Sequence, residues 1–487
     1  MASGPFKVII IGGSIAGLTL AHCLDKAGID YVVLEKRKEV TPQEGASILI
    51  LPHGGRILDQ LGVFNALEAH VQPLHTAHIS YPDGFKHTNR SPQVLADRFG
   101  VPMALVERRN LLKVLYDTLP DRSRVQVDKK VLALEHEQGS LVTVQVEDGA
   151  IYKGSLVVGA DGVHSRVRSE LWRLADKEKP GAIKDKEKSS MTVKYACVFG
   201  ISNSVSNLVP GEQISTLNDG RSFLTFPGKS GRVFWFLMNK LERKYAYSEV
   251  PRLTSEDAKR MAEQYVDDHI WNGVHFKDIW DKREVFGATN LEENIFQTWH
   301  WGRVLCLGDS MHKMAPNTGQ GANCAIEDAA LLTNYLRQSI NSTKESTKEN
   351  RKLSDEKLST VLEQFSQDRI ERLQSIYRLA RVVVRLHARQ NLFLRLMGRY
   401  YLPHTGDLPA DMASKSIAGG VYLDFLPLPG RSGPGWKHFA SKTHSLPRSL
   451  TLFSALVLIL GIAFWTGRGI LLPSIQGLGL IETSIHS

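Results

Sequence analysis

The N-terminal part of the chain alternates apolar runs with a glycine-rich turn. The run "VIII" after Lys7 is typical of a buried strand, and "GGSIAG" follows it with three glycines. An apolar helical pattern and a second strand-like run, "YVVLE", complete the segment from Lys7 to about Val71. Further strand-like runs begin near Leu141 and Ser155. This order predicts the βαβ start of a parallel sheet.

The middle of the chain has a different pattern. Between about Ser189 and Phe286, apolar and polar positions alternate in "MTVKYACVFGI", "SFLTFPG" and "RVFWFLMN", as in half-buried strands. A helical pattern covers Ser255 to Trp271. The run "GRVLCLGD" then returns to the buried-strand pattern. We therefore expect a mostly antiparallel sheet with one helix, inserted between two parts of the first domain.

Two segments nearer the C-terminus are predicted to be helical. The first is amphipathic and extends from Leu358 to about Tyr400. The second, Ser449 to Thr466, has 18 uncharged residues between Arg448 and Arg468, which is close to the minimum for crossing a bilayer. A buried core helix is the alternative. The Pro/Gly-rich linker "FLPLPGRSGPGW" before it favours a membrane anchor.

The composition, with 42% apolar and 23% charged residues, is that of an ordinary folded protein. The net charge of +9 raises the possibility of a nucleic-acid partner, but no recognition motif accompanies it. Many cations lie near the C-terminus, as in Arg378 to Gln390, where basic residues suit an anionic membrane surface. We therefore expect membrane lipid as a partner and no nucleic acid.

The four cysteines show neither paired spacing nor a zinc pattern. They are expected to be buried, reduced thiols, and no metal site is predicted.

The first candidate motif is the glycine turn and the strand after it. Gly12 permits a tight turn, and Gly17 lets the helix pack closely on the sheet, so that its N-terminal amides can bind a pyrophosphate. Glu35 ends the next strand, where a carboxylate accepts hydrogen bonds from a ribose diol. Ser14 occupies a position that is usually glycine. An ordinary strand-turn-helix without ligand is the alternative.

Two further motifs follow strands later in the chain. In "LVVGADGVHSRVR", Asp161 ends a strand and is placed to contact a dinucleotide, although Asp-Gly also forms plain turns. In "CLGDSMHKMAPNTGQGAN", Asp309 is placed to bind a second sugar-like chain. The small residues after it would bring bare backbone against a flat ring, with the amides of a helix from about Asn323 facing it. These residues include Pro316, Gly319, Gly321 and Ala322.

The three motifs in this order resemble the class A flavoprotein monooxygenases of the para-hydroxybenzoate hydroxylase type, from about Lys7 to Tyr400. Within that family, "SILILPHGGRILDQLG" and "LVERRNLLKVL" are similar to fungal enzymes that epoxidise the prenyl tails of meroterpenoids and indole diterpenes. The resemblance places flavin contacts on Glu35, Arg108, Asp309 and Ala322, with Arg108 on the pyrophosphate side. Leu49 stands where family members commonly have glycine, and a backbone contact is compatible with the leucine.

The resemblance also implies the reaction. NADPH reduces FAD, O₂ adds at flavin C4a, and the distal oxygen of the hydroperoxide passes to an apolar prenylated substrate. Tyr195 on the middle sheet is the favoured catalytic candidate. We expect this sheet to supply an apolar pocket, with plain sheet core as the alternative for most of the candidate positions. These positions are Tyr195, Phe199, Phe223, Phe226, Phe234 and Trp235. His312 is expected to have a structural role. The product would pass to a membrane terpene cyclase, and a C-terminal anchor would hold the enzyme at the endoplasmic reticulum with its catalytic part in the cytosol.

Two other functions remain open. The same scaffold hydroxylates aromatic rings, so a phenolic or polyketide substrate is the second enzymatic reading. A prenyl-binding chaperone of the fold of Rab GDP-dissociation inhibitors is the non-enzymatic one.

The expected fold class is α/β: a Rossmann-like FAD-binding domain with an inserted antiparallel sheet domain, a helical C-terminal region and a membrane helix. The expected segments are FAD-binding (1–188), the substrate sheet (189–290), the FAD-binding return (291–340), a polar loop (341–357), a helical region (358–430), a linker (431–448) and the anchor (449–472).

Overall fold

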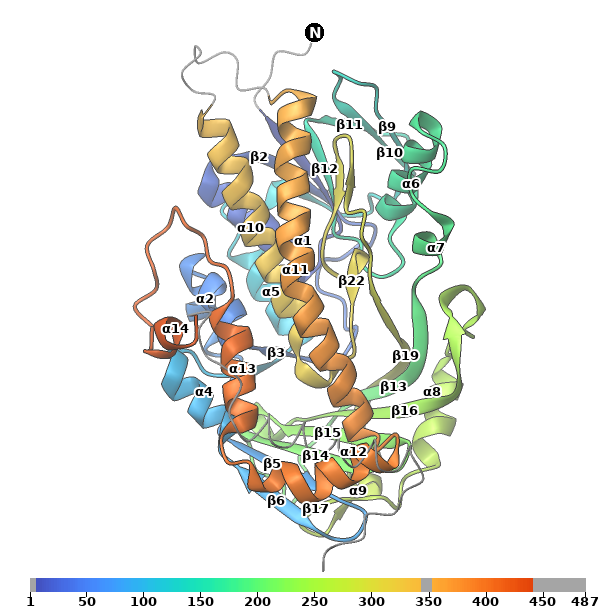
Figure 1. Cartoon of the computed structure of the whole chain (residues 1–487), viewed down its shortest axis with the longest axis vertical. Helices are drawn as coiled ribbons and strands as arrows, with labels where there is room; N and C mark the ends of the chain where they lie inside the picture. The colour runs from blue at the N-terminus through green and yellow to red at the C-terminus, as the bar shows by residue number, and fades with distance from the viewer. Residues whose placement is uncertain (1–5, 343–352, 441–487) are drawn as a thin grey trace, which may run out of the picture. The chain divides into compact units, whose positions relative to one another are not determined.

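The computed structural model describes residues 6–342 and 353–440 of the 487-residue chain. Its first large sheet has six strands, and all neighbours are parallel except the edge pair β20–β21. The apolar run of β1 is buried because helices cover the sheet, with α1, α10 and α11 packed in succession (Figure 1). The strands in spatial order are β20 (His300–Trp301), β21 (Val304–Cys306), β12 (Leu156–Gly159), β1 (Lys7–Ile11), β2 (Asp30–Leu34) and β8 (Val125–Gln126). The three helices are α1 (Ile15–Ala27), α10 (Gln320–Ser342) and α11 (Asp355–His387).

The second large sheet has eight strands and is antiparallel except for the parallel pair β14–β5. The expected antiparallel sheet is therefore present. It also includes β5, β6 and β22, which lie outside the predicted 189–290 segment. The strands in spatial order are β22 (His312–Lys313), β19 (Arg283–Ile295), β13 (Thr192–Ser202), β16 (Val233–Ala246), β15 (Arg221–Pro227), β14 (Glu212–Asn218), β5 (Thr76–Ser80) and β6 (Lys86–Asn89).

The two faces of the eight-stranded sheet carry separate apolar clusters, because successive side chains of a strand point to opposite faces. The outer cluster packs beneath α8 (Ser255–Glu263) and α9 (Phe276–Trp280). The inner cluster faces the rest of the described chain. Its sheet members are Tyr195, Cys197, Ile201, Leu224, Phe226, Phe234, Met238 and Leu291.

Two small sheets and several helices complete the described region. The small sheets are β11 (Ile151–Gly154), β10 (Val142–Val146) and β9 (Val131–Glu135), and β3 (Ser47–Ile50), β7 (Ala104–Glu107) and β4 (Gln72–Pro73). The helices used below are α2 (Pro52–Gln60), α4 (Ser91–Phe99), α5 (Arg108–Asp117), α6 (Arg166–Glu178), α12 (Leu392–Leu396), α13 (Leu408–Ala418) and α14 (Gly435–His438).

Two predicted helices were too long. The helix expected to reach Trp271 ends at Glu263, and His269–Trp271 forms strand β17 instead, because Asn272 and Gly273 adopt positive φ angles of 47° and 81° and turn the chain into β18 (Val274–His275).

The amphipathic helix expected to reach Tyr400 breaks after His387. Arg389 has a φ of 46°, which is incompatible with a right-handed helix. The side chain of Asn391 then caps the start of α12 by accepting a bond from the amide of Leu394.

Within residues 6–342 and 353–440, none of the helices has both the length and the apolar character needed to cross a bilayer. The predicted anchor (449–472), the second half of the linker and most of the polar loop lie outside the described residues.

Candidate functional site

The first glycine turn connects β1 to α1 at the carboxyl end of the parallel sheet. Gly12 has a φ of 110°, and a Cβ atom there would lie 2.4 Å from the carbonyl oxygen of Ala160. A Cβ atom at Gly17 would lie 1.9 Å from the carbonyl oxygen of Gly12. Neither position therefore has room for a side chain. The close packing leaves the first amides of α1 available for an anion.

Glu35 and Arg108 lie beside this turn. The Glu35 side chain is buried. Its carboxylate accepts hydrogen bonds from the Gly13 amide at 2.7 Å and from the Arg37 amide at 2.9 Å. A carboxylate has about four acceptor sites, so Glu35 retains capacity for a ribose hydroxyl. Arg108, the first residue of α5, donates to the Ser14 hydroxyl at 3.0 Å. This bond places its guanidinium, which stays charged, on the pyrophosphate side of the turn.

The third motif meets the first one in space. Gly308 has a φ of 64°, and a Cβ atom there would lie 3.3 Å from Cβ of Ala16 in α1. Asp309 follows at the start of a short 3₁₀ turn and forms an ion pair with Lys313 at 2.5 Å. The structure thus brings Asp309 next to the helix that carries the first glycine turn.

The segment from Pro316 to Ala322 forms a turn of small residues that enters α10. Pro316 opens a 3₁₀ turn, and Gly319 ends it with a φ of 63°. A Cβ atom at Gly319 would lie 3.0 Å from the Leu49 side chain, so Leu49 contacts this turn. At Gly321, the nearest neighbour of an added Cβ would be Asp309 Oδ1, at 3.8 Å. A methyl group at Gly321 would therefore make only an ordinary van der Waals contact with the protein, unlike one at Gly12 or Gly17.

Asn323 holds this turn against β3, a role that the sequence alone did not indicate. Its side-chain oxygen accepts from the amide of Leu51 at 2.9 Å. Its nitrogen donates to the carbonyl oxygens of Leu49 at 2.8 Å and Gly319 at 2.7 Å. Asn323 is fully buried. The only sequence signal was a polar residue in the apolar start of a helix.

A buried network of charges lies beneath the turn. Asp328 of α10 accepts from His312 at 2.7 Å, so His312 has the structural role that was predicted. Arg369 of α11 bonds to Asp328 at 2.7 Å and Glu327 at 2.9 Å, and Arg372 adds a bidentate pair with Glu327. Burial alone would raise the pKa of Glu327, but the two arginines outweigh it and lower the pKa to about 2. The network fixes α10 to α11.

Asp161 was predicted to contact the cofactor directly, but in the structure its carboxylate bonds to the start of α6. Its carboxylate accepts from the Ser165 hydroxyl at 2.5 Å and from the amides of Arg166 at 2.7 Å and Val167 at 3.0 Å. It therefore caps the start of α6. Its neighbour Ala160 lies against Gly12, so the backbone of the second motif leaves no room for a side chain in the first glycine turn. A cofactor contact of Asp161 stays a prediction.

Tyr195 lies in the inner cluster and is 1% exposed. Its hydroxyl donates to Oε1 of Gln390 at 2.9 Å, and burial raises the pKa of the phenol to about 12. The hydroxyl is thus neutral and already bonded. The catalytic role of Tyr195 stays a prediction.

The six aromatic and apolar positions expected to line one pocket divide between the two faces of the sheet. Phe223 and Trp235 belong to the outer cluster and pack against Phe276 of α9, with ring centroids 4.9 and 5.2 Å from it. For these two positions the sheet-core alternative holds, because strand alternation turns their side chains to the outer face. The positions on the inner face are Tyr195, Phe199, Phe226 and Phe234.

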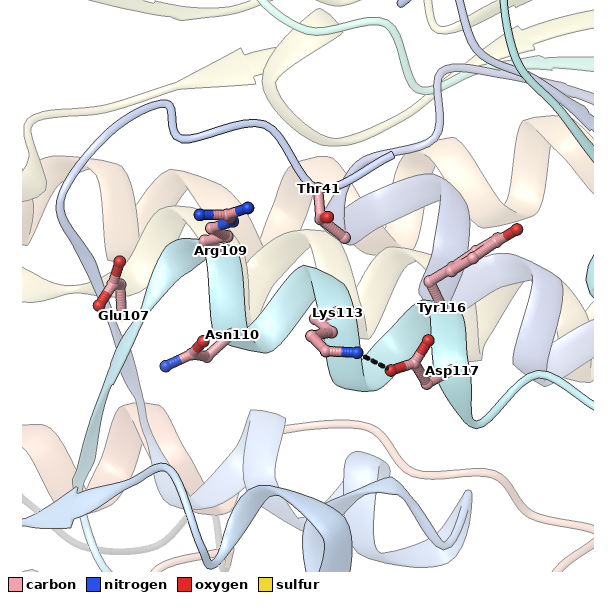
Figure 2. Close-up of a pocket in the computed structure, with 7 residues that line it drawn as sticks. All are labelled: Thr41, Glu107, Arg109, Asn110, Lys113, Tyr116 and Asp117. Atoms are coloured by element: carbon pink, nitrogen blue, oxygen red, sulfur yellow. Dashed lines mark hydrogen bonds and ion pairs between the residues drawn. The ribbon is translucent and has the colours of Figure 1, made fainter. Parts of the chain in front are cut away.

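A separate hollow of about 500 Å³ lies on the outer side of α5 (Figure 2). Thr41, Arg109 and Asn110 contribute to its lining, and Lys113 and Asp117 form an ion pair at one end. No residue predicted to bind the flavin lines it. Its polar, charged lining does not suit an apolar substrate or a flavin ring.

The residues near the turn fit FAD. The turn before α1 leaves no room for a side chain at Gly12, whereas the turn before α10 leaves space at Gly321. Glu35 and Asp309 supply carboxylates for hydroxyl groups. The buried side-chain oxygens of Asn317 and Thr318 have no hydrogen-bond partner within the described chain. They are therefore available to a bound group.

The fold and the site together define a flavin-binding α/β oxidoreductase. Residues 5–350 match the FAD binding domain family, and the chain belongs to this family. It is 68% identical over 481 residues to the FAD-dependent monooxygenase esdpE of Penicillium shearii, an alignment that covers 99% of both chains. The FAD-dependent monooxygenase spyC of Aspergillus fumigatus is 57% identical over 470 residues, covering 96% of this chain and 98% of that protein. The chain is thus a FAD-dependent monooxygenase, which argues against the prenyl-binding chaperone.

Solved structures show the same fold. The structure of Klebsiella pneumoniae HpxO, complexed with FAD and uric acid, matches with a TM-score of 0.68 at 22% identity, over 86% of this chain and 98% of that one. A salicylate hydroxylase in a substrate complex matches with a TM-score of 0.61 at 18% identity, over 81% and 94%. The resemblance to class A flavoprotein monooxygenases is confirmed.

Proposed function

We propose that the enzyme uses NADPH and O₂ to epoxidise an olefin on the prenyl tail of a terpenoid or meroterpenoid in secondary-metabolite biosynthesis. The observation that carries this proposal is the apolar character of the inner cluster. Ala315, next to the Pro316 turn, and Leu49, which contacts Gly319, pack against this cluster of aromatic and aliphatic side chains. An isoprenoid tail would bury apolar surface there without leaving polar groups unpaired.

Two hydrogen bonds pair polar groups beside the inner cluster. Tyr195 bonds to Gln390, and the Asn317 amide lies 3.1 Å from Nδ1 of His387. Desolvation lowers the pKa of His387 to about 4, so the imidazole is neutral and a weak base at physiological pH. A phenol would need a base to ionise it, whereas an isolated olefin needs none. This contrast favours epoxidation over ring hydroxylation.

Bound FAD would supply the reducing equivalents and the activation of O₂. Glu35, Arg108 and Asp309 would hold it, and the bare turn at Gly319 to Ala322 would accept its ring. The apolar side chains of the inner cluster would exclude water and hold the double bond near that ring.

Membrane association is part of the proposal. We propose that residues 449–472 anchor the enzyme to the endoplasmic reticulum with the catalytic part in the cytosol. An apolar substrate concentrates in lipid, so an anchored enzyme meets it at a raised local concentration. The epoxide would be opened by a membrane terpene cyclase, which is the expected functional partner.

The test is to incubate the full-length holoprotein in membranes with NADPH and a panel of prenylated polyketides and indole diterpenes. Epoxide on a terminal isoprene unit, identified by mass spectrometry and NMR, is the expected product. Hydroxylation of a ring with the tail intact would contradict the proposal and indicate the phenolic reading.

A matched pair of variants examines the substrate surface. Phe236 packs against the inner cluster and Phe286 against the outer cluster, and both are partly buried. Phe236→Ala is expected to raise KM for the epoxidised substrate roughly tenfold, as loss of about 1–2 kcal/mol of apolar contact implies. Phe286→Ala should leave KM unchanged. Equal effects of the two variants would remove the inner cluster from the substrate site.

A further inference from the structure

The short helix α12 and the π-helical turn after it, η6 (Met397–Tyr401), carry an exposed apolar surface. Leu392 is 70% exposed, Phe393 47%, Leu396 50% and Tyr400 61%. At 3.6 residues per turn these four side chains fall within an arc of about 100°. We call these four residues the α12 face. Four large apolar side chains gathered on one helical face mark an interaction site rather than scattered exposure.

The α12 face is held firmly by its opposite side. The hydroxyl of Tyr81 donates to the carbonyl oxygen of buried Gly398. Arg399 donates to Asp83 at 2.7 Å, and its guanidinium lies 3.7 Å from the centroid of the Phe85 ring. These contacts fix the element to the β5–β6 hairpin. The apolar side chains are therefore exposed on an ordered helix and not on a frayed chain end.

The segment that carries the α12 face has an excess of positive charge. The stretch from Arg372 to Gly406 contains seven arginines and no acidic residue. Six of these arginines pair with four carboxylates from other parts of the chain, so the arginines exceed their partners by three. These carboxylates are Glu327, Glu293, Asp219 and Asp83. The Arg381 side chain is 45% exposed and that of Arg395 42% exposed. Apolar side chains flanked by arginines match the boundary between anionic headgroups and acyl chains. A second copy of the same face would instead bring arginines against arginines.

The α12 face also lies next to the inner cluster. Ala388 belongs to that cluster, Gln390 accepts the bond from Tyr195, and Leu392 opens the exposed arc. Only three residues, 389–391, thus separate the apolar interior from the exposed surface. In addition, the chain continues for 47 residues beyond Ala440, a length that includes the 18 uncharged residues from Ser449 to Thr466.

We infer that the α12 face inserts into the headgroup–acyl boundary of an anionic bilayer and directs the adjacent inner cluster toward the lipid. This inference rests on the membrane association proposed above but uses a different surface. It does not depend on the reaction.

The test exploits the cysteines, since all four are buried and free. Leu396→Cys in the full-length holoprotein is labelled with an environment-sensitive fluorophore and mixed with vesicles containing phosphatidylserine and a lipid-borne quencher. Ile151→Cys is the matched control, because Ile151 is 62% exposed on β11, at the end of the view in Figure 1 opposite to α12. We expect a blue shift and at least twofold quenching at position 396 and neither at 151. Replacing phosphatidylserine by phosphatidylcholine should reduce the quenching.

Three outcomes would overturn the inference. One is a label at position 396 that stays unquenched while the protein floats with the vesicles, which would leave the C-terminal anchor as the sole contact. A second is equal quenching at positions 396 and 151. The third is a blue shift at position 396 that appears without vesicles and grows with protein concentration, which would indicate self-association. Product analysis is measured separately, so none of these outcomes bears on epoxidation.

Discussion

Gly17 and Gly321 both lack a side chain, but for different reasons. At Gly17 the obstacle is the protein's own backbone, since an added Cβ would lie 1.9 Å from the Gly12 carbonyl oxygen. At Gly321 the protein leaves room, with the nearest atom at 3.8 Å. A requirement for glycine at position 321 would therefore come from the bound cofactor.

Gly321→Ala is expected to leave the thermal unfolding of the apoprotein unchanged and to weaken FAD binding at least tenfold, because the methyl group would occupy the space of the ring. Fluorescence titration with FAD and thermal unfolding measure the two effects. Gly17→Ala is the contrasting variant and should lower the unfolding temperature even without FAD. Unaltered FAD affinity in Gly321→Ala would place the ring elsewhere.

At the scale of elements, the turn before α10 depends on Asn323. Its three hydrogen bonds connect β3, the start of α2 and the turn itself. Asn323→Ala should lower the free energy of unfolding by about 2–4 kcal/mol, because the buried amide of Leu51 loses its acceptor. Urea unfolding measures this change.

Asn334 provides the control on the same helix. It donates to the carbonyl oxygen of Tyr422 at a solvent-exposed bond of 2.8 Å. Asn334→Ala is expected to cost less than about 1 kcal/mol. If both variants lose the same stability, the clamp at Asn323 has no special role.

The elements that local pattern determines were predictable from sequence. The strand, turn and helix from Lys7 to Ala27 follow one another along the chain, so their pattern was sufficient. The end of α11 at His387 was not predictable, because the apolar pattern continues and only the φ of Arg389 reveals the break. The parallel pairing of β5 with β14 was also not predictable, because its paired residues, such as Thr76 and Glu212, lie far apart in the sequence.

The candidate site was predictable where backbone geometry demands a residue type. Glycine at positions 12 and 17 is such a case. Polar side chains are different, since Asp161 caps a helix and Asn323 forms a clamp, yet both looked like plain motif members. Their roles depend on partners that lie far away in sequence.

At the scale of the whole molecule, buried histidines link stability to pH. His53 of α2 is fully buried, and burial lowers its pKa to about 4, against 6.5 in the unfolded chain. Between pH 6.5 and 4 the unfolded state therefore binds more protons, and stability falls as the pH falls. The pKa of Glu327 is lowered from 4.5 to about 2, so the ionised carboxylate also stabilises the fold. This stabilisation is lost as the pH falls from about 4.5 to 2.

His53→Asn should flatten the fall of the unfolding temperature between pH 6.5 and 4, because it removes a difference on the order of 2 kcal/mol. Calorimetry of the full-length protein across this range measures the slope. His70→Asn, at an exposed position, is the control and should keep the slope of the parent. A parent-like slope in His53→Asn would show that other groups cause the acid sensitivity.

The charges shared by α10 and α11 also bear on how such enzymes can be recombined. Arg369 on one helix compensates Glu327 and Asp328 on the other, all without access to water. A chimera that takes only one of the two helices from a relative with different partners would bury an uncompensated charge. The helices should therefore be inherited as one module, with crossover points before α10 or after α11 rather than in the stretch that joins them.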